Sequence, residues 1–215
     1  MFSREPKQSR SSTLRISRKI KRRLLILHVF AIEVNYLIEV RWHGRGGQGV
    51  VTSSELLARA ALREGKYVQH FPEFGPERRG APVRAYTRIN DQSIDIHYGV
   101  YEPDIVVVID PTLLANVELI TAGLKDNGYL VLNTTKVSDE IVKVAKDKML
   151  KVYTVDAHKI ALDIFNRPLY NTPMLGALIK VTGLAALSSV LEAVSYTHLR
   201  AHETEADLVC RLLLE

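Results

Sequence analysis

The segment Trp42-His43-Gly44-Arg45-Gly46-Gly47-Gln48-Gly49 decides the predicted fold, because of what lies on either side of it. An alternating apolar segment, residues 37–42, precedes its glycines, and a segment with helical spacing of apolar side chains, residues 50–64, follows them. Four glycines within six residues form a turn that bends sharply, exposes backbone amides and allows another chain to approach closely. This order of strand, turn and helix predicts an α/β scaffold of the nucleotide-binding type.

Gly44, Gly46 and Gly49 satisfy the pattern Gly-x-Gly-x-x-Gly. A dinucleotide-binding domain adds an acidic residue about 20 positions further on, at the end of the second strand, which holds the ribose. Here that region is Gln69-His70-Phe71, and Glu73 lies beyond a proline. Three interpretations stay open: a backbone site for a phosphate or a partner chain, a tight turn that serves packing, and a free-standing NAD-type domain without its acidic residue.

Strands and helices continue to alternate after this turn. Further strands are expected at residues 67–71, 83–89, 93–97, 105–109, 129–132 and 151–155, and further helices at residues 113–124, after Ser138, at 157–165 and from 171 onward. The β-branched run 105–109 is typical of a parallel strand that is buried on both faces. The pattern predicts an α/β fold over residues 38–194: a doubly wound, mostly parallel, Rossmann-like sheet with an inserted antiparallel hairpin.

Several turn and cap signals set the expected boundaries. Gly65 is placed to end the first helix, and Ser138 to cap a later one. Residues 72–82 contain three prolines and two glycines, which favours irregular structure. Asn90-Asp91 forms the expected turn of the hairpin between 83–89 and 93–97. In Asn171-Thr172-Pro173, Thr172 is the expected N-cap and Pro173 the first helical residue.

Charge and cysteine content restrict the function classes. The chain of 215 residues has a net charge of +5, but nine basic residues and one acid lie within the first 23 residues, so the remainder is slightly acidic. We therefore expect no nucleic-acid partner, and no membrane partner because no apolar run is long enough to span a bilayer. The single cysteine, Cys210, supplies neither a disulfide nor an iron–sulfur cluster, and it predicts a reducing, cytoplasmic setting.

The two ends differ from the middle of the chain. Residues 1–37 form a Ser- and Arg-rich segment, which we interpret as a basic leader or an upstream extension outside the fold. The dispersed histidines 43, 70, 97 and 158 lack metal-ligand spacing, and no serine or cysteine lies in a nucleophile motif, so no catalytic or metal-binding residue is assigned. The run Glu77-Arg78-Arg79-Gly80 suits a phosphate, a carboxylate, a subunit contact or a solvated charge cluster.

Four ordered motifs together resemble a known family. They are residues 42–49, residues 71–82 (Phe-Pro-Glu-Phe-Gly-Pro-Glu-Arg-Arg-Gly-Ala-Pro), Tyr101-Glu102-Pro103-Asp104, and residues 171–177 (Asn-Thr-Pro-Met-Leu-Gly-Ala). The chain is similar to the gamma subunit of 2-oxoacid:ferredoxin oxidoreductases, in the pyruvate and 2-ketoisovalerate branch. The resemblance covers residues 38–194, whereas residues 195–215 look unrelated and are interpreted as an artefactual tail.

The resemblance implies a subunit that is not a complete enzyme. Complexes of this family decarboxylate a 2-oxo acid on thiamine diphosphate and Mg²⁺, transfer the acyl group to coenzyme A and pass electrons through iron–sulfur clusters to ferredoxin. Those cofactors are expected on the alpha, beta and delta subunits, with none bound by this chain alone. The resemblance also implies that this domain shapes the approach of coenzyme A. The residues assigned to that binding site are Arg45, Gly46, Gly47, Gln48, Gly49, Arg78 and Arg79.

Overall fold

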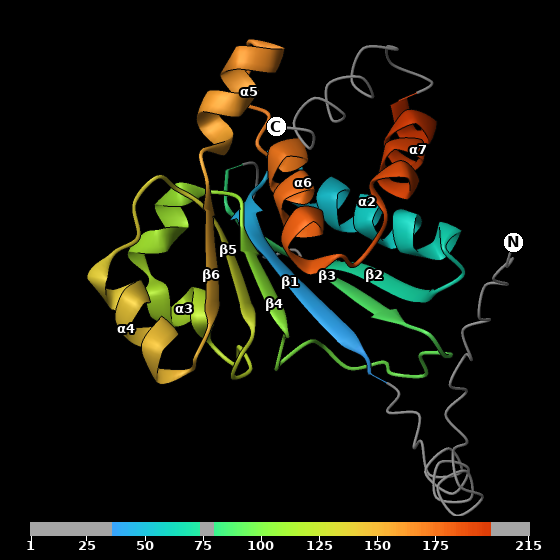
Figure 1. The fold of residues 1–215 in the computed structure, drawn as a ribbon, viewed down its shortest axis with the longest axis horizontal. Helices are drawn as coiled ribbons and strands as arrows, with labels where there is room; N and C mark the ends of the chain where they lie inside the picture. Colours follow the sequence, from blue (N-terminus) through green and yellow to red (C-terminus); the bar gives the residue numbers. More distant parts are fainter. Residues whose placement is uncertain (1–35, 74–79, 199–215) are drawn as a thin grey trace, which may run out of the picture. The chain divides into compact units, whose positions relative to one another are not determined.

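A computed structural model describes residues 36–73 and 80–198, which lie within one compact unit (Figure 1). One sheet has the strand order β2-β3-β1-β4-β5-β6. Its strands are β1 (Ile38–Arg45), β2 (Tyr67–Glu73), β3 (Pro82–Asn90), β4 (Ile105–Val108), β5 (Tyr129–Asn133) and β6 (Lys151–Val155). The helices are α2 (Val50–Arg63), the 3-10 helix η1 (Pro111–Ala115), α3 (Val117–Thr121), α4 (Asp139–Asp147), α5 (Ala157–Phe165), α6 (Asn171–Thr182) and α7 (Leu187–His198).

The sheet is mostly parallel, as predicted. β1, β4, β5 and β6 pair in parallel, and β3 runs antiparallel to both β1 and β2. The antiparallel hairpin is therefore present, but its strands are β2 and β3. The expected strand at residues 93–97 is wrong, because both edges of β3 are already paired. That segment instead lies beside β2, where Gln69 Nε2 donates to the carbonyls of Ile94 and Ile96 at 3.0 Å.

β2 extends further than the sequence predicts. We expected irregular structure from Pro72, yet β2 continues through Pro72 to Glu73, opposite Ala85 and Arg84 of β3. β2 is an edge strand, and an edge position tolerates a residue without an N–H donor. Arg78 and Arg79 lie outside the described residues.

The expected helix at residues 113–124 is also wrong. Two short helices, η1 and α3, replace it, because the side chain of Asn116 accepts a hydrogen bond from Leu119 N at 3.0 Å and so begins a new helix. α6 begins at Asn171, so Thr172 lies inside the helix rather than at its N-cap, and Pro173 is its third residue. Proline fits there because the N–H groups of the first turn have no intrahelical partner.

Other boundary signals are confirmed. Ser138 Oγ caps α4 by accepting from Ile141 N at 3.4 Å. After α2, Gly65 adopts a φ of +80° and donates to Leu62 O, while Lys66 donates to Ala61 O. These two hydrogen bonds form a Schellman motif, which satisfies the last carbonyls of the helix.

Two apolar cores lie on opposite faces of the sheet. On one face, α2, α6 and α7 pack over β1 and β4, with Trp42, Val107 and Leu178 fully buried. On the other face, α3 and α4 pack over β4 and β5, where Val106 and Leu130 are fully buried. Figure 1 shows α2, α6 and α7 grouped together, apart from α3 and α4. This arrangement places the glycine turn at the carboxyl end of β1, where the chain enters α2.

Candidate functional site

The glycine turn lies at the switch point of the sheet. β1 is followed by α2 on one face and its parallel neighbour β4 by η1 and α3 on the other. Open α/β sheets bind ligands in the crevice that this change of direction leaves beyond the carboxyl ends of the strands. The predicted residues Arg45, Gly46, Gly47, Gln48 and Gly49 therefore occupy the expected position for a binding site.

Packing explains two of the three fingerprint glycines. A Cβ atom on Gly44 would lie 2.4 Å from Val50 Cγ2, and one on Gly49 would lie 2.8 Å from Asn171 Cγ. Gly49 also adopts a φ of +74°, which favours glycine. The first turn of α6 thus packs directly on the glycine turn, and Ser53 Oγ strengthens this contact by donating to Asn171 O at 3.3 Å. The tight-turn interpretation accounts for these glycines.

A polar network fills the crevice between β1 and β4. Gln48 Oε1 accepts from Arg45 N at 2.8 Å, and Gln48 Nε2 donates to Asp110 Oδ2. Arg45 Nε lies 3.4 Å from the same carboxylate oxygen and 3.2 Å from Thr112 Oγ1. Burial by itself raises the pKa of the Asp110 carboxyl. The hydrogen bonds from Thr112 and Gln48 and the charge of Arg45 lower this pKa by more, so that it lies below its ordinary value. The carboxylate is therefore charged at neutral pH, and Arg45 neutralises it.

The glycine turn contacts Gly80 and Ala81 just before β3. Arg45 Nη1 donates to Gly80 O at 3.1 Å, and Gly46 N donates to Ala81 O at 2.9 Å. Arg78 and Arg79, which we predicted as binding residues, lie outside the described residues. Gly80, which the structure places beside the turn, follows them directly in the sequence.

The sheet order disfavours the NAD-type alternative. In a dinucleotide-binding fold, the strand after the first helix pairs with the first strand and presents its terminal acid to the ribose. Here β3 lies between β2 and β1. Glu73, at the end of β2, accepts a hydrogen bond from Tyr86 OH and lies 3.8 Å from Arg84 Nη1. The acid is therefore two strands away from the glycine turn and bound to other partners.

The comparisons with known proteins agree on one family. The model of the pyruvate ferredoxin/flavodoxin oxidoreductase family matches residues 39–205. The chain is 55% identical over 161 residues, 75% of its length and 86% of the relative's, to the pyruvate/ketoisovalerate oxidoreductases common subunit gamma of Thermococcus kodakarensis. It is 49% identical over 158 residues, 74% of its length and 84% of the relative's, to the pyruvate synthase subunit PorC of Methanocaldococcus jannaschii.

The chain belongs to this family. The crystal structure of the pyruvate oxidoreductase subunit PORC of Thermotoga maritima superposes with a TM-score of 0.70 at 43% identity, over 82% of this chain and 93% of that one. The resemblance to gamma subunits seen in the four sequence motifs is thereby confirmed.

Within this family fold, the sequence analysis missed three polar residues at the site. Asp110 lies two residues after the buried strand β4 and caps η1, and an acid after an apolar β-branched run was the available signal. Asn133 ends β5, donates to Ile109 O at 2.8 Å and accepts from Ala157 N at 3.1 Å, so it ties two strands to α5. Asn171 packs on Gly49. A sequence pattern does not show which side chains meet across the sheet.

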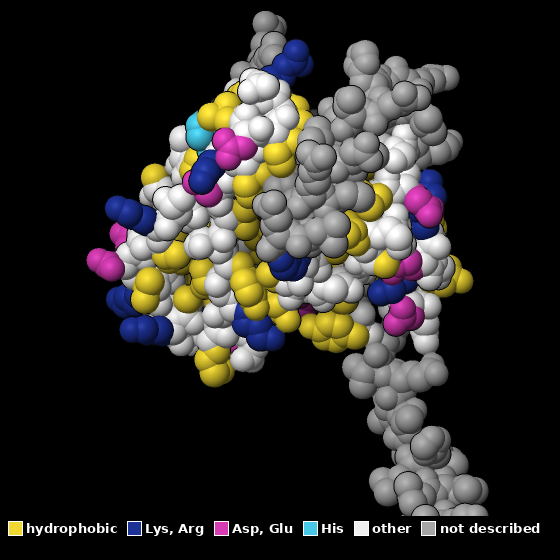
Figure 2. Space-filling view, turned by 45° about the horizontal axis from the view of Figure 1, so that its top comes forward, with side chains coloured by type: hydrophobic (Ala, Val, Ile, Leu, Met, Phe, Trp, Pro, Cys, Tyr) yellow, Lys and Arg dark blue, Asp and Glu magenta, His cyan; other side chains and the backbone are white. Residues whose placement is uncertain are grey.

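The described surface has few features of other binding classes. Residues 36–73 and 80–198 contain no group of three His, Cys, Asp or Glu side chains placed to hold a metal ion. Over the same described ranges, no helix is both long and apolar enough to cross a membrane. On the face shown in Figure 2, Lys and Arg side chains of the described residues are interspersed with Asp and Glu rather than gathered into one patch.

Proposed function

We propose that this chain is the gamma subunit of a pyruvate, or related 2-oxoacid, ferredoxin oxidoreductase complex and is not an enzyme by itself. The observation that carries this proposal is the 55% identity to a common gamma subunit of pyruvate and ketoisovalerate oxidoreductases, over 86% of that subunit. Such a complex carries out oxidative decarboxylation of a 2-oxo acid to acyl-coenzyme A and passes electrons to ferredoxin.

The cofactors of this reaction are proposed to lie on the alpha, beta and delta subunits. Thiamine diphosphate with Mg²⁺ supplies the decarboxylation chemistry, and iron–sulfur clusters carry the electrons. A cluster needs about four thiolates, whereas this chain has one cysteine. The proposed setting of the complex is the cytoplasm, in keeping with that cysteine content.

Co-purification tests the assignment as a subunit. The chain is co-expressed with the alpha, beta and delta subunits encoded in its source genome, and the tagged chain is isolated. We expect a stable heteromeric complex with 2-oxoacid-dependent ferredoxin reduction, and no such activity from the chain alone. A stable monomer that associates with none of the three would contradict the proposal.

The proposed role of this chain's own residues is to receive the phosphates of coenzyme A. Two observations support it. Among the described residues, the N–H groups of Gly47 and Gly49 have no hydrogen-bond partner, and the start of α2 favours an anion there. The contacts of Arg45 and Gly46 with Gly80 and Ala81 tether the segment that carries Arg78 and Arg79. Because Arg45 is paired with Asp110, we assign it to positioning this segment.

A double substitution tests this role. Charge-assisted contacts contribute about 1.5–3 kcal/mol each, so replacing Arg78 and Arg79 by Ala should raise the KM for coenzyme A at least about tenfold. The KM for the 2-oxo acid should change little. Replacing Arg59 and Arg63 on α2 by Ala is the matched control. An intact double variant with unchanged coenzyme A dependence would remove both residues from the site.

A further inference from the structure

One half of the sheet has a charged face that is only partly covered, by α3 beside Arg41 and by the main chain of residues 98–99 beside Arg88. The register of β2, β3 and β1 places nine side chains on this face, opposite the face that packs on α2. They form three rows across the strands: Glu73, Arg84 and His43; Phe71, Tyr86 and Arg41; and Gln69, Arg88 and Glu39. We call these nine side chains the charged face.

A pocket of about 430 Å³ opens on the charged face. Arg41, Arg84, Tyr86 and Glu73 line it together with Tyr101. This volume lies within the range of ligand-binding pockets. Its lining carries two guanidinium groups and one carboxylate, so it favours an anion.

Arg41 is incompletely paired within this pocket. The residue is 6% exposed, and its Nη2 donates to Ile120 O at 3.0 Å and to Ala122 O at 2.7 Å, at the end of α3. Its Nε is buried and has no hydrogen-bond partner among the described residues. A buried N–H donor without a partner is costly, so the guanidinium group of Arg41 is incompletely satisfied on the wall of this pocket.

Arg84 is available to an acceptor from outside the domain. Its side chain is 37% exposed, and its Nη1 lies 3.8 Å from Glu73 Oε2, beyond hydrogen-bond distance. The carboxylate of Glu73 already accepts a hydrogen bond from Tyr86 OH. The pocket therefore holds one positive charge in excess, with the buried guanidinium group of Arg41 on its wall and the partly exposed guanidinium group of Arg84 open to solvent.

A second, smaller pocket of about 210 Å³ adjoins the first and shares Glu73 and Arg84 with it. Its other lining residues include His43, Leu119 and Ile120. Burial, and then the charges of Arg41 and Arg84, lower the pKa of His43 to about 3. The imidazole is therefore neutral, and its Nε2 has no hydrogen-bond partner among the described residues. This second pocket is more apolar than the first.

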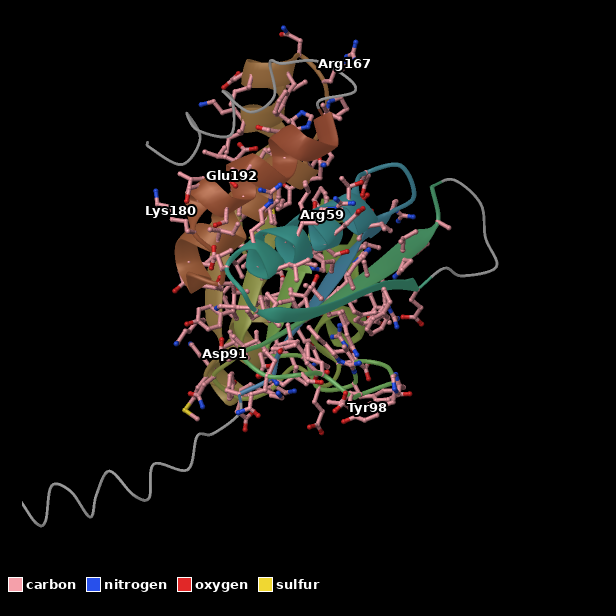
Figure 3. The ribbon with its side chains drawn as sticks, turned by 90° about the vertical axis from the view of Figure 1, so that its right-hand side faces the viewer. Arg59, Asp91, Tyr98, Arg167, Lys180 and Glu192 are labelled. Carbon is pink, nitrogen blue, oxygen red and sulfur yellow. The ribbon has the colours of Figure 1, made fainter. Side chains whose placement is uncertain are left out.

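Aromatic side chains lie beside the pocket. Tyr98 is 63% and Tyr101 is 73% exposed, and their rings stack with centroids 6.5 Å apart. Figure 3 shows Tyr98 on the opposite side of the sheet from Arg59 of α2. Exposed tyrosines together with arginines are the residues that contribute most to binding at protein–protein interfaces.

We propose that the charged face binds another subunit of the complex, which inserts an Asp or Glu side chain between Arg41 and Arg84. An apolar side chain next to that carboxylate occupies the pocket beside His43. Charge complementarity and the Tyr- and Arg-rich lining identify the occupant as an acidic segment of a protein partner. This proposal rests on the proposed function, since it requires that the chain assembles with other subunits.

Graded substitution of Arg84 in the co-expressed complex tests the proposal. Loss of a charge-assisted contact weakens binding about tenfold or more, so Arg84→Ala should weaken subunit association at least about tenfold. Arg84→Glu should weaken it further, because it adds repulsion. Glu73→Gln should strengthen association, since it removes the carboxylate that competes for Arg84. Dissociation constants are measured by titrating labelled chain into the remaining subunits.

Arg63→Glu is the matched control. The side chain of Arg63 is also 37% exposed and also lies near a glutamate, Glu192, but it lies on α2. We expect less than a twofold change for this variant. Equal effects of the Arg84 and Arg63 substitutions would overturn the proposal.

Two further measurements separate the outcomes. The unfolding midpoint of each uncomplexed variant checks that the fold is retained. A titration of the uncomplexed chain with acetate tests for a small carboxylate as the occupant: saturable binding that Arg84→Ala abolishes, with subunit association unchanged, would overturn the protein partner. If the unsubstituted chain associates with none of the subunits, the proposed function fails instead.

Discussion

The two halves of the sheet are held in different ways. In the half formed by β4 and β5, the side chains of both faces are apolar except for Asn133 at the end of β5, and they pack under helices. In the half formed by β1, β3 and β2, one face packs on α2, whereas the other is the charged face, with Arg41, Arg88 and His43 buried on it. The comparison shows that apolar packing is sufficient to hold a strand in the sheet when helices cover both of its faces. On the charged face, buried polar side chains are instead held by hydrogen bonds and ion pairs, such as those of Arg41 and Arg88.

The largest effect is expected from Arg88→Met on the charged face. Arg88 is 1% exposed, its Nε lies 2.8 Å from Glu39 Oε1, and its Nη2 lies 2.7 Å from Tyr98 O. Removing one partner of a buried ion pair costs about 3–5 kcal/mol, and urea unfolding should show this loss. Replacing both Arg88 and Glu39 by Met should recover most of it. If the double variant is as unstable as the single one, the loss comes from other contacts of Arg88.

A smaller loss is expected from Leu132→Ala in the parallel half. Leu132 is fully buried in the core under α4. Substitution of a buried leucine by alanine costs about 2–5 kcal/mol, and here the loss should be the same at pH 5 and pH 8 because no titratable group is involved. Leu162, which is 39% exposed on α5, gives the control, with an expected loss within about 0.5 kcal/mol. A loss in the free energy of unfolding that depends strongly on pH would contradict the conclusion that apolar packing alone holds this half of the sheet.

The smallest effect is the pH dependence caused by His43. Its pKa is about 3 in the folded chain and about 6.5 when unfolded. The unfolded state therefore binds the proton first, and folding stability falls as the pH drops from about 6.5 towards 3. Between pH 7 and pH 5 the unsubstituted chain should lose about 2 kcal/mol more than His43→Gln. Equal losses in the two proteins would show that His43 is not buried in its neutral form.

Particular residues show how far the sequence predicts this molecule. Period-two alternation and β-branched runs located β1, β4, β5 and β6, because burial on one or both faces of a strand leaves a local pattern. Cap residues such as Ser138 and Gly65 were equally informative, since a cap acts within a few residues of the chain. The hairpin was assigned to the wrong partner because strand pairing depends on which edges are open, and this is a property of the whole sheet.

The candidate site also has one part that the sequence predicted and another that it did not. The sequence identified the glycine turn and its position between a strand and a helix. It did not show that Asp110 would neutralise Arg45, or that Gly49 is a glycine because Asn171 packs on it. Arg41 and His43 alternate with Val40 and Trp42 along β1, so the pattern indicated two different faces.

By itself, the amino-acid sequence determined the α/β class, the position of the glycine turn and the family, because local periodicity and four ordered motifs carry that information. The tertiary structure alone decided that β3 separates β2 from β1, which takes Glu73 away from the glycine turn. It also decided that Arg41, Arg84 and Tyr86 meet around one pocket. Arg41 lies more than 40 positions before Arg84 and Tyr86 and on a different strand, and only the register of the assembled sheet brings it to them.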